Sequence, residues 1–297
     1  MSYLELFTSS SKVFSGLQKD LKEADYVVLG VPFDLTSTYR SGSRFAPSAI
    51  REASLNIETY SFRSGIDLEE LKIHDAGDLH VSADVEEMLR RLELVTKDLF
   101  RAIKAPILIG GEHTITLGAV RGFDREIAIV IFDAHLDLRD EYLDQRVCHA
   151  TSARRLCEEA KVKKVIEVGT RAVCREELEY AKKTGVRFFT SRQVLRYSAE
   201  DVSKDVRSFL DGCEAVYLSV DMDVLDPAFA PGVQNPEPDG LTTHLLLDLL
   251  CDLCDSRVVG FDVTEVTPHY DTGVTAIQAA KVIFEVLCSL EKNRRQI

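Results

Sequence analysis

The sequence predicts an α/β fold in which one mainly parallel sheet of roughly eight strands lies between two layers of helices. Short apolar runs rich in β-branched residues alternate with segments whose apolar residues recur at helical spacing, along nearly all of the 297 residues. This alternation is typical of a three-layer α/β/α arrangement with right-handed crossovers. No Ser-, Gly- or Pro-rich linker and no internal repeat interrupts it, so we expect a single domain over residues 1–297.

The individual elements follow from the apolar pattern. The predicted strands are Tyr26–Val31, Ile107–Gly110, Ile127–Phe132, Val165–Gly169, Val186–Phe189, Ala215–Val220 and Val258–Phe261, with Lys72–Asp75 as a weaker eighth. Apolar residues at helical spacing from Val85 to Ile103, and again from Ala276 to Leu290, predict amphipathic helices. Ser198, followed by two acids, predicts a helix start.

Charge and cysteine content restrict the environment of the protein. A formal net charge of -13 argues against nucleic acid or an anionic membrane as partner and favours a small cation. The N-terminal residues lack the apolar core of a signal peptide, and no uncharged apolar run is long enough to span a membrane, so we expect a cytoplasmic protein. The seven cysteines are predicted to be reduced, with Cys251 and Cys254 in the core.

Acids and imidazoles follow several of the predicted strands. The run Ile127–Phe132 ends in Asp133, His135 and Asp137, which share one side if the chain stays extended. Three other strands lead into Gly110-Gly111-Glu112-His113, Asp221-Met222-Asp223 and Asp262-Val263-Thr264-Glu265. The carboxyl ends of parallel strands meet at one edge of the sheet, where ligands bind. Each motif alone has an ordinary alternative, such as a solvated loop or a turn, whereas together they indicate one site.

The composition of this cluster predicts a metal centre. Four carboxylates and two imidazoles are too many ligands for one ion and suit two, with Asp133 and Asp221 bridging. Two divalent cations would balance the four aspartates. A shell of hard oxygens with imidazole and no thiolate favours manganese over a closed zinc site, and magnesium seldom takes histidine. Iron, cobalt and nickel stay open as alternatives.

Three of these stretches resemble the signatures of the ureohydrolase family, which comprises the arginases, the agmatinases and their relatives. They are Gly110–His113, Asp133–Asp137 and Ser219–Asp223, the last followed by Pro227, Pro231, Gly232 and Gly240. The resemblance implies an arginase-like fold and a dimanganese hydrolase that releases urea from a guanidino compound by attack of a metal-bridging hydroxide. It also implies that one manganese binds His113, Asp133, Asp137 and Asp221, and the other His135, Asp133, Asp221 and Asp223.

The same resemblance implies roles in catalysis and substrate binding. Asp137 would hydrogen-bond the attacking hydroxide, His149 would transfer a proton to the leaving amine, and Glu265 would clamp the guanidinium by bidentate pairing. The alternatives are a helix-start histidine for His149 and an exposed strand-end acid for Glu265. The family tends to form trimers and hexamers, so a homo-oligomer is expected.

The substrate is expected to be a small cationic guanidino compound. Val31–Asp34, Thr38–Pro47 and Asp75–Asp78 are similar to the agmatinase branch, which implies conversion of agmatine and water to putrescine and urea. The acids of Leu138–Gln145, where arginases carry a Ser-Gly-Asn-rich segment, favour an ammonium group. Gln234 and Asp239 depart from glycines common in the family.

Other functions stay open. Within the enzyme class they are those of an arginase, a guanidinobutyrase, an aminopropylagmatine ureohydrolase or, on a related fold, a single-zinc deacetylase. In a different class, the chain would be a non-catalytic metal-binding regulatory homologue. The paired histidines and four aspartates speak against a single-zinc site. The presence of both His149 and Glu265 speaks against a pure metal binder, which needs no residue for proton transfer.

Overall fold

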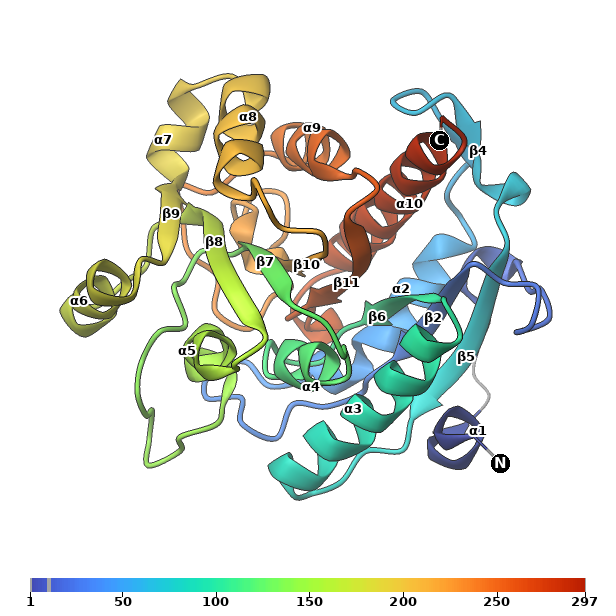
Figure 1. Cartoon of the computed structure of the whole chain (residues 1–297), viewed down its shortest axis with the longest axis horizontal. Coiled ribbons are helices and arrows are strands. Elements are labelled where there is room, and N and C mark those ends of the chain that lie inside the picture. Colours follow the sequence, from blue (N-terminus) through green and yellow to red (C-terminus); the bar gives the residue numbers. More distant parts are fainter. Residues whose placement is uncertain (1, 10–11, 297) are drawn as a thin grey trace.

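The computed structural model describes residues 2–9 and 12–296 and contains a twisted nine-stranded sheet (Figure 1). The strand order is β1-β5-β2-β6-β11-β10-β7-β8-β9. β1 pairs antiparallel with β5 at one edge, and all other neighbours in this sheet are parallel. The strands are β1 Thr8–Ser9, β2 Tyr26–Gly30, β5 Ile73–Leu79, β6 Ala105–Ile109, β7 Ile127–Phe132, β8 Val162–Thr170, β9 Arg187–Thr190, β10 Val216–Asp221 and β11 Val258–Thr264.

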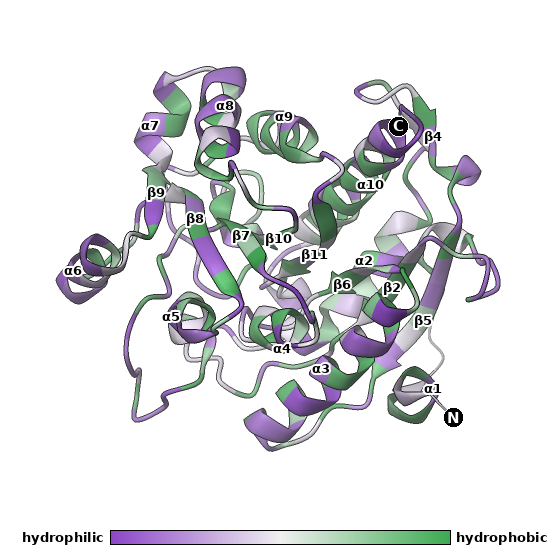
Figure 2. Cartoon of the chain, in the orientation of Figure 1, coloured by the Kyte–Doolittle hydropathy of each residue, from purple (hydrophilic) through white to green (hydrophobic). Residues whose placement is uncertain are grey.

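Helices cover both faces of the sheet, as predicted, and enclose two apolar cores (Figures 1 and 2). One face packs against α1 Tyr3–Phe7, α3 Val85–Arg101, α4 Ile115–Arg121, α5 Ser152–Glu158 and α6 Arg175–Thr184. The other packs against α2 Ala46–Ser54, α7 Ser191–Arg196, α8 Ala199–Phe209, α9 Thr243–Leu253 and α10 Val274–Arg294. A separate hairpin, β3 Tyr60–Ser61 and β4 Ile66–Asp67, lies beside α10.

The structure differs from the sequence prediction at the edge of the sheet and at the end of one helix. The sheet has nine strands in the described residues rather than eight, because Thr8 and Ser9 add an edge strand too short to show any periodicity. The weak strand Lys72–Asp75 is in fact the seven-residue β5. Ile103 lies beyond the end of α3, with φ 57° and 93% exposure, so its assignment to the apolar stripe is wrong.

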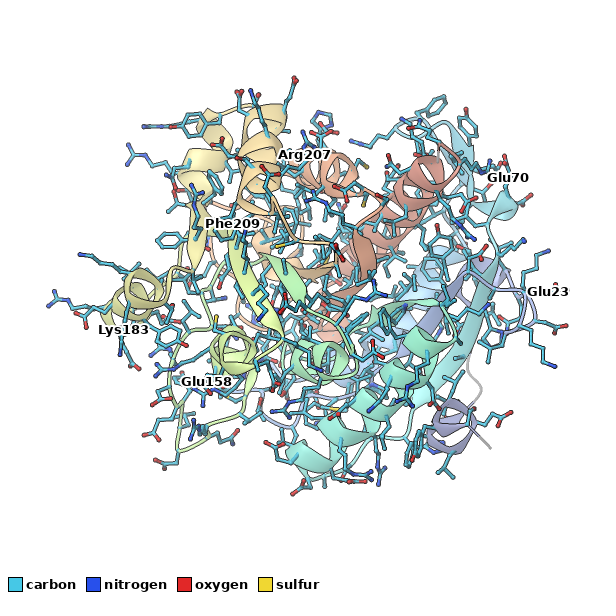
Figure 3. The ribbon with its side chains drawn as sticks, viewed as in Figure 1. Glu23, Glu70, Glu158, Lys183, Arg207 and Phe209 are labelled. Atoms are coloured by element: carbon cyan, nitrogen blue, oxygen red, sulfur yellow. The ribbon has the colours of Figure 1, made fainter. Side chains whose placement is uncertain are left out.

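Two smaller expectations are confirmed. Ser198 caps α8 by accepting a hydrogen bond from the Asp201 backbone N–H, and all seven cysteines are free. Charged side chains, such as the labelled Glu23 and Lys183, project from the outside of the molecule (Figure 3). Within residues 2–9 and 12–296, none of the helices has both the length and the apolar composition that a membrane span requires.

The motif Asp75–Asp78 serves the fold. Arg51 on α2 is completely buried and pairs with Asp75 at 2.8 Å and with Asp78 at 2.5 Å. Removing one partner of such a buried pair leaves an uncompensated charge, which costs about 3–5 kcal/mol. These contacts therefore fix α2, and the loop that precedes it, against β5.

Gly111 brings three segments together at the carboxyl edge of the sheet. A Cβ atom at this position would lie 2.3 Å from the carbonyl oxygen of Phe33 and 2.6 Å from that of Val31, so only glycine fits. The backbone N–H of Glu112 donates to the Phe33 carbonyl at 2.8 Å, and that of Glu265 donates to the Gly111 carbonyl at 2.8 Å. The loops after β2, β6 and β11 are therefore held in contact.

Glu167 on β8 is a buried acid without a hydrogen-bond partner for either carboxylate oxygen in the described part of the chain. Burial, followed by the negative charges of Asp133 and Asp137, raises its pKa well above the ordinary value of 4.5. The folded chain thus keeps a proton that the unfolded chain has released. Stability must therefore fall as the pH rises from the ordinary pKa toward the raised one.

Glutamine at position 167 keeps the side-chain shape and cannot ionise, so E167Q is expected to stabilise the protein increasingly with pH. Each pH unit between the two pKa values is worth about 1.4 kcal/mol, or roughly 3 °C in Tm for a chain of this size. In thermal unfolding, E167Q and the wild type should have similar Tm values at pH 5, whereas at pH 8 E167Q should have the higher Tm. The exposed Glu179→Gln is the control. An E167Q effect that does not vary with pH would contradict this explanation.

Candidate active site

The eight predicted site residues lie together at the carboxyl edge of the sheet. His113 follows β6, Asp221 ends β10, Glu265 follows β11, and His149 begins the 3₁₀ turn His149–Thr151. A cavity of about 270 Å³ opens at this edge, and six of the eight residues line it: His135, Asp137, His149, Asp221, Asp223 and Glu265. The other two, His113 and Asp133, are buried beside them. The cavity is of a size for a small molecule rather than a polymer.

His113, Asp133 and Asp221 form the first group that could hold a metal ion. His113 Nδ1 lies 2.9 Å from Asp133 Oδ2 and 3.6 Å from Asp221 Oδ2. Asp137 lies beside this group, because its Oδ2 is 3.1 Å from the same nitrogen, and could add a fourth ligand. Asp137 reaches this position although β7 ends at Phe132 and its own φ is 48°. The assumption of an extended chain through Asp137 is therefore wrong, and a turn brings the side chain to the cluster.

Asp133, His135 and Asp223 form the second such group. His135 Nδ1 lies 3.0 Å from Asp223 Oδ2 and 3.4 Å from Asp133 Oδ1. Asp133 thus belongs to both groups, one carboxylate oxygen facing each imidazole, as expected of a bridging ligand. Asp221 belongs to the first group only. It is nevertheless linked to the second group, because its carboxylate accepts the backbone N–H of Asp223 at 2.9 Å.

The electrostatics of the cluster fit divalent cations. His113 Nδ1 is buried and has no hydrogen-bond partner in the described structure, although two carboxylates lie close to it. Burial, together with the neighbouring Asp223 and Asp133 carboxylates, raises the pKa of Asp221 well above its ordinary value. Burial and Asp133 also raise the pKa of Asp137, to about 6. Without cations such a site retains protons, and metal binding would release them.

A polar network behind His113 fixes the imidazole. Its Nε2 lies 3.1 Å from Ser219 Oγ, and Ser219 donates to Asp262 Oδ1 at 2.6 Å. Since the hydroxyl proton points to Asp262, Ser219 accepts the Nε2 proton, and Nδ1 presents a lone pair to the carboxylate cluster. Ser219 and Asp262 are direct partners in the register of β10 and β11. The parallel pairing therefore determines which nitrogen of His113 can bind an ion.

Glu265 lines the cavity and has one carboxylate oxygen without a partner in the described residues. Its Oε1 accepts the backbone N–H of His113 at 2.7 Å, whereas its Oε2 is buried and has no partner among residues 2–9 and 12–296. Burial and the charge of Glu112 raise the pKa of Glu265 well above its usual range. The residue also holds a positive φ of 67°. A strained, buried acid with an unused oxygen is suited to an incoming cation.

His149 lies between two hydroxyl groups of the Phe33–Pro47 loop. Thr36 Oγ1 is 3.4 Å from its Nδ1, and Thr38 Oγ1 is 3.4 Å from its Nε2. Burial, followed by the positive charge of His135, lowers the pKa of His149 to about 4. The imidazole is therefore neutral near pH 7 and can take up a proton and release it again.

Two further charged residues, Arg139 and Glu237, also line the cavity. Arg139 contributes a guanidinium that lies 5.2 Å above the Tyr142 ring, and Glu237 contributes a carboxylate. Neither side chain makes an ion pair in the described part of the chain. The acids of Leu138–Gln145 were expected to supply negative charge here, but Asp140 pairs with Arg155 at 2.8 Å and does not line the cavity. None of the three acids of this stretch lines the cavity, whereas Glu237 does.

The two departures from the family pattern lie in the loop that carries Glu237. Asp239 has φ 67°, a conformation that glycine adopts without strain, which explains why glycine is common there. Gln234 is fully buried and accepts a hydrogen bond from Ser37, so it joins this loop to the Phe33–Pro47 loop.

Sequence reasoning missed Thr36, Thr38, Glu112 and Ser219 as neighbours of the site. Glu112 stands in a motif chosen for its histidine, and two of its three hydrogen bonds are made with Thr36, 76 residues away. Nothing local in the sequence indicates such a pair. For Ser219 a signal existed, because it lies two residues before Asp221 on a predicted strand and so shares its face.

Comparisons with known proteins agree over nearly the whole chain. The model for the arginase family matches residues 24–289. The chain is 39% identical to the agmatinase of Pyrococcus horikoshii over 272 residues, which cover 90% of this chain and 93% of that protein. It is 38% identical to the N(1)-aminopropylagmatine ureohydrolase of Thermococcus kodakarensis over 282 residues, with 92% and 93% covered.

A solved structure shows the same agreement in three dimensions. The agmatine ureohydrolase of Thermoplasma volcanium matches with a TM-score of 0.89 at 38% sequence identity, covering 99% of this chain and 98% of the other. The arginase-like fold expected from the sequence is thereby confirmed.

Because Asp133 belongs to both groups of ligands, D133A is expected to abolish stabilisation by Mn²⁺. After chelation, adding Mn²⁺ at about 100 times its Kd should stabilise the wild type by about 2.7 kcal/mol, since the ion binds only the folded chain. Differential scanning calorimetry with and without Mn²⁺ measures this as a shift in Tm. The exposed Asp124→Ala should keep the full shift. A D133A protein that also keeps it would exclude Asp133 as a shared ligand.

Proposed function

This chain belongs to the arginase family, and from that premise we propose that it is a dimanganese ureohydrolase that converts agmatine and water to putrescine and urea. The wider class, hydrolysis of a guanidino compound, follows from the agreement with relatives along nearly the whole chain. The narrower assignments of substrate, ion and residue roles depend on the geometry of the cavity.

The proposal rests chiefly on Glu265. Glu265 lines the cavity together with Asp137, Asp221 and His149, and its Oε2 is buried without a hydrogen-bond partner among the described residues. A guanidinium carries planar N–H donors that match a carboxylate, and the pair fixes the central carbon in one orientation. An exposed strand-end acid, the alternative considered from the sequence, would not be 3% exposed with one oxygen unused.

Six side chains would hold the two ions: His113, Asp133, Asp137 and Asp221 the first, and His135 and Asp223, with Asp133 shared, the second. When bound, the ions supply a water whose pKa is lowered to about 7, and hence a strong nucleophile near neutral pH. The donor set of four carboxylates and two imidazoles without thiolate supports manganese. Asp137 would accept a hydrogen bond from the attacking water, and Ser152, which donates to Asp137 Oδ2 at 3.1 Å, orients that carboxylate.

The residues of the chain then account for the remaining chemistry. Glu265 holds the guanidinium so that its carbon faces the ligand cluster. As the oxygen of water bonds to that carbon, the bond from the carbon to the substituted nitrogen must break. The leaving amine needs a proton, and His149, neutral near pH 7, takes one up and hands it to this nitrogen. The products are urea and a protonated amine, which balances the reaction.

The charges of Arg139 and Glu237 on the cavity wall support two candidate substrates. Glu237 would pair with the ammonium group of agmatine, which makes agmatine the leading candidate. Arg139 favours a second candidate, a guanidino acid such as 4-guanidinobutanoate, whose carboxylate it would pair with. A small cation would also be drawn to a chain of net charge -13, which supports agmatine.

A urea assay with agmatine, 4-guanidinobutanoate and arginine tests the function directly. After manganese loading, agmatine is expected to give the highest kcat/KM. E237Q should lower kcat/KM about three- to tenfold for agmatine only, because a half-exposed charge pair is worth about 1 kcal/mol. R139Q is the matched control and should lower kcat/KM only for 4-guanidinobutanoate. A preference for the acid would favour the second candidate, and no urea from any guanidine would indicate a non-catalytic metal binder.

Replacing His149 tests the proton transfer. H149A is expected to lower kcat about 10²–10⁴-fold, the loss typical of a missing general acid, with bound manganese unchanged. Steady-state kinetics at pH 7 and metal analysis of the same samples measure both quantities. The exposed His244→Ala should behave as wild type. Wild-type turnover in H149A would remove this residue from the mechanism.

A further inference from the structure

Glu112 is a completely buried acid that makes no ion pair in the described residues. Its Oε2 accepts the backbone N–H of Thr36 at 2.8 Å, and its Oε1 accepts the hydroxyls of Thr36 at 2.5 Å and Thr114 at 2.7 Å. Two of its three hydrogen bonds thus go to one residue of the Phe33–Pro47 loop. Burying an acid is costly, and these contacts suggest why the chain keeps one here.

Thr36 connects this carboxylate to His149. The Thr36 hydroxyl donates its only proton to Glu112, so it can act toward His149 only as an acceptor. It accepts the backbone N–H of His149 at 3.1 Å, and it lies 3.4 Å from the ring Nδ1. Only a protonated Nδ1 is compatible with an acceptor at that position. The arrangement therefore favours the tautomer with its proton on Nδ1.

The other ring nitrogen, Nε2, then carries a lone pair, to which the Thr38 hydroxyl can donate. His149 Nε2 lies 3.4 Å from Thr38 Oγ1, and both residues line the cavity. A neutral imidazole with a bare Nε2 can accept a proton there and release it to a leaving amine. The opposite tautomer would present an N–H to the substrate and leave Nδ1 facing another acceptor.

We propose that Glu112 and Thr36 are positioning residues that hold His149 in the Nδ1–H tautomer, ready for proton transfer through Nε2. This inference rests on the proposed role of His149 in catalysis. Neither residue touches the substrate cavity, and both act through the imidazole.

Contacts other than that of the Thr36 hydroxyl also hold the loop. The Phe33 carbonyl already accepts the Glu112 backbone N–H, and Asp34 accepts the Gly42 N–H at 2.8 Å and pairs with Arg44 at 2.6 Å. None of these bonds uses the Thr36 hydroxyl. Its removal is therefore expected to change the state of His149 rather than the position of the loop.

Thr36→Val removes the hydroxyl and keeps the shape of the side chain. We expect a 10- to 100-fold lower kcat, with KM for agmatine and bound manganese changed less than twofold, and recovery of most of kcat in T36S. Thr114→Val is the matched comparison. It removes another hydroxyl that donates to Glu112, but this hydroxyl does not reach His149, so T114V should lower kcat less than T36V does. In an H149A background T36V should cause no further loss, since the two act as one unit.

The tautomer itself is measured without the reaction, by ¹H–¹⁵N NMR of the full chain labelled at histidine and loaded with diamagnetic Zn²⁺. The signals missing in H149A identify this ring. Wild type should show a protonated Nδ1 and a bare Nε2, and T36V should shift toward the opposite form.

An unchanged tautomer in T36V, or a loss of kcat that persists in the H149A background, would overturn the inference. If the wild type held the tautomer but released no urea from any guanidine, the proposed function would fail while the positioning of His149 stood.

Discussion

The repulsion among four neighbouring carboxylates, one of them Asp133, is the constraint on which the rest of the site depends. Asp133, Asp137, Asp221 and Asp223 are all less than one-tenth exposed, and only two imidazoles lie among them. Such a group cannot ionise fully unless cations or protons compensate it. Binding of cations would therefore be coupled to the folding of this edge, and Asp133, which belongs to both groups that could hold a metal ion, would join them into one unit.

The parallel sheet brings these carboxylates together and also holds them in place. β6, β11, β10 and β7 are neighbours in space although they come from distant parts of the sequence, and their carboxyl ends converge on one edge. The backbone is strained there, with positive φ at Asp137 and Glu265. Strain of this kind persists only where the surroundings fix it. Here the close contact at Gly111 and the backbone bond from Glu265 to it provide that support.

Sequence patterns were sufficient for the strands and for the cluster, because both depend on local rules. A buried strand shows as an apolar run, and polar groups after it must lie at the sheet edge. What the sequence did not reveal depends on contacts between distant segments. The two-residue β1 exists only by pairing with β5, and the contact of Thr36 with Glu112 joins two loops. The prediction for Ile103 was wrong because an apolar residue at this position continues the helical period, although the helix has already ended.

The cavity is lined by two kinds of side chain, and this bears on how substrates are selected. The groups proposed for the reaction are buried and are fixed by networks such as Ser219 with Asp262. Arg139 and Glu237 are half-buried side chains on loops, which no ion pair in the described chain restrains. Replacing either of them removes no residue of the ligand cluster, so the same cluster would serve different guanidino compounds. The matching relatives are named for agmatine and for aminopropylagmatine, two substrates that differ only away from the guanidinium. Selection between an amine and an acid would accordingly depend on the balance of these two loop residues rather than on the metal centre.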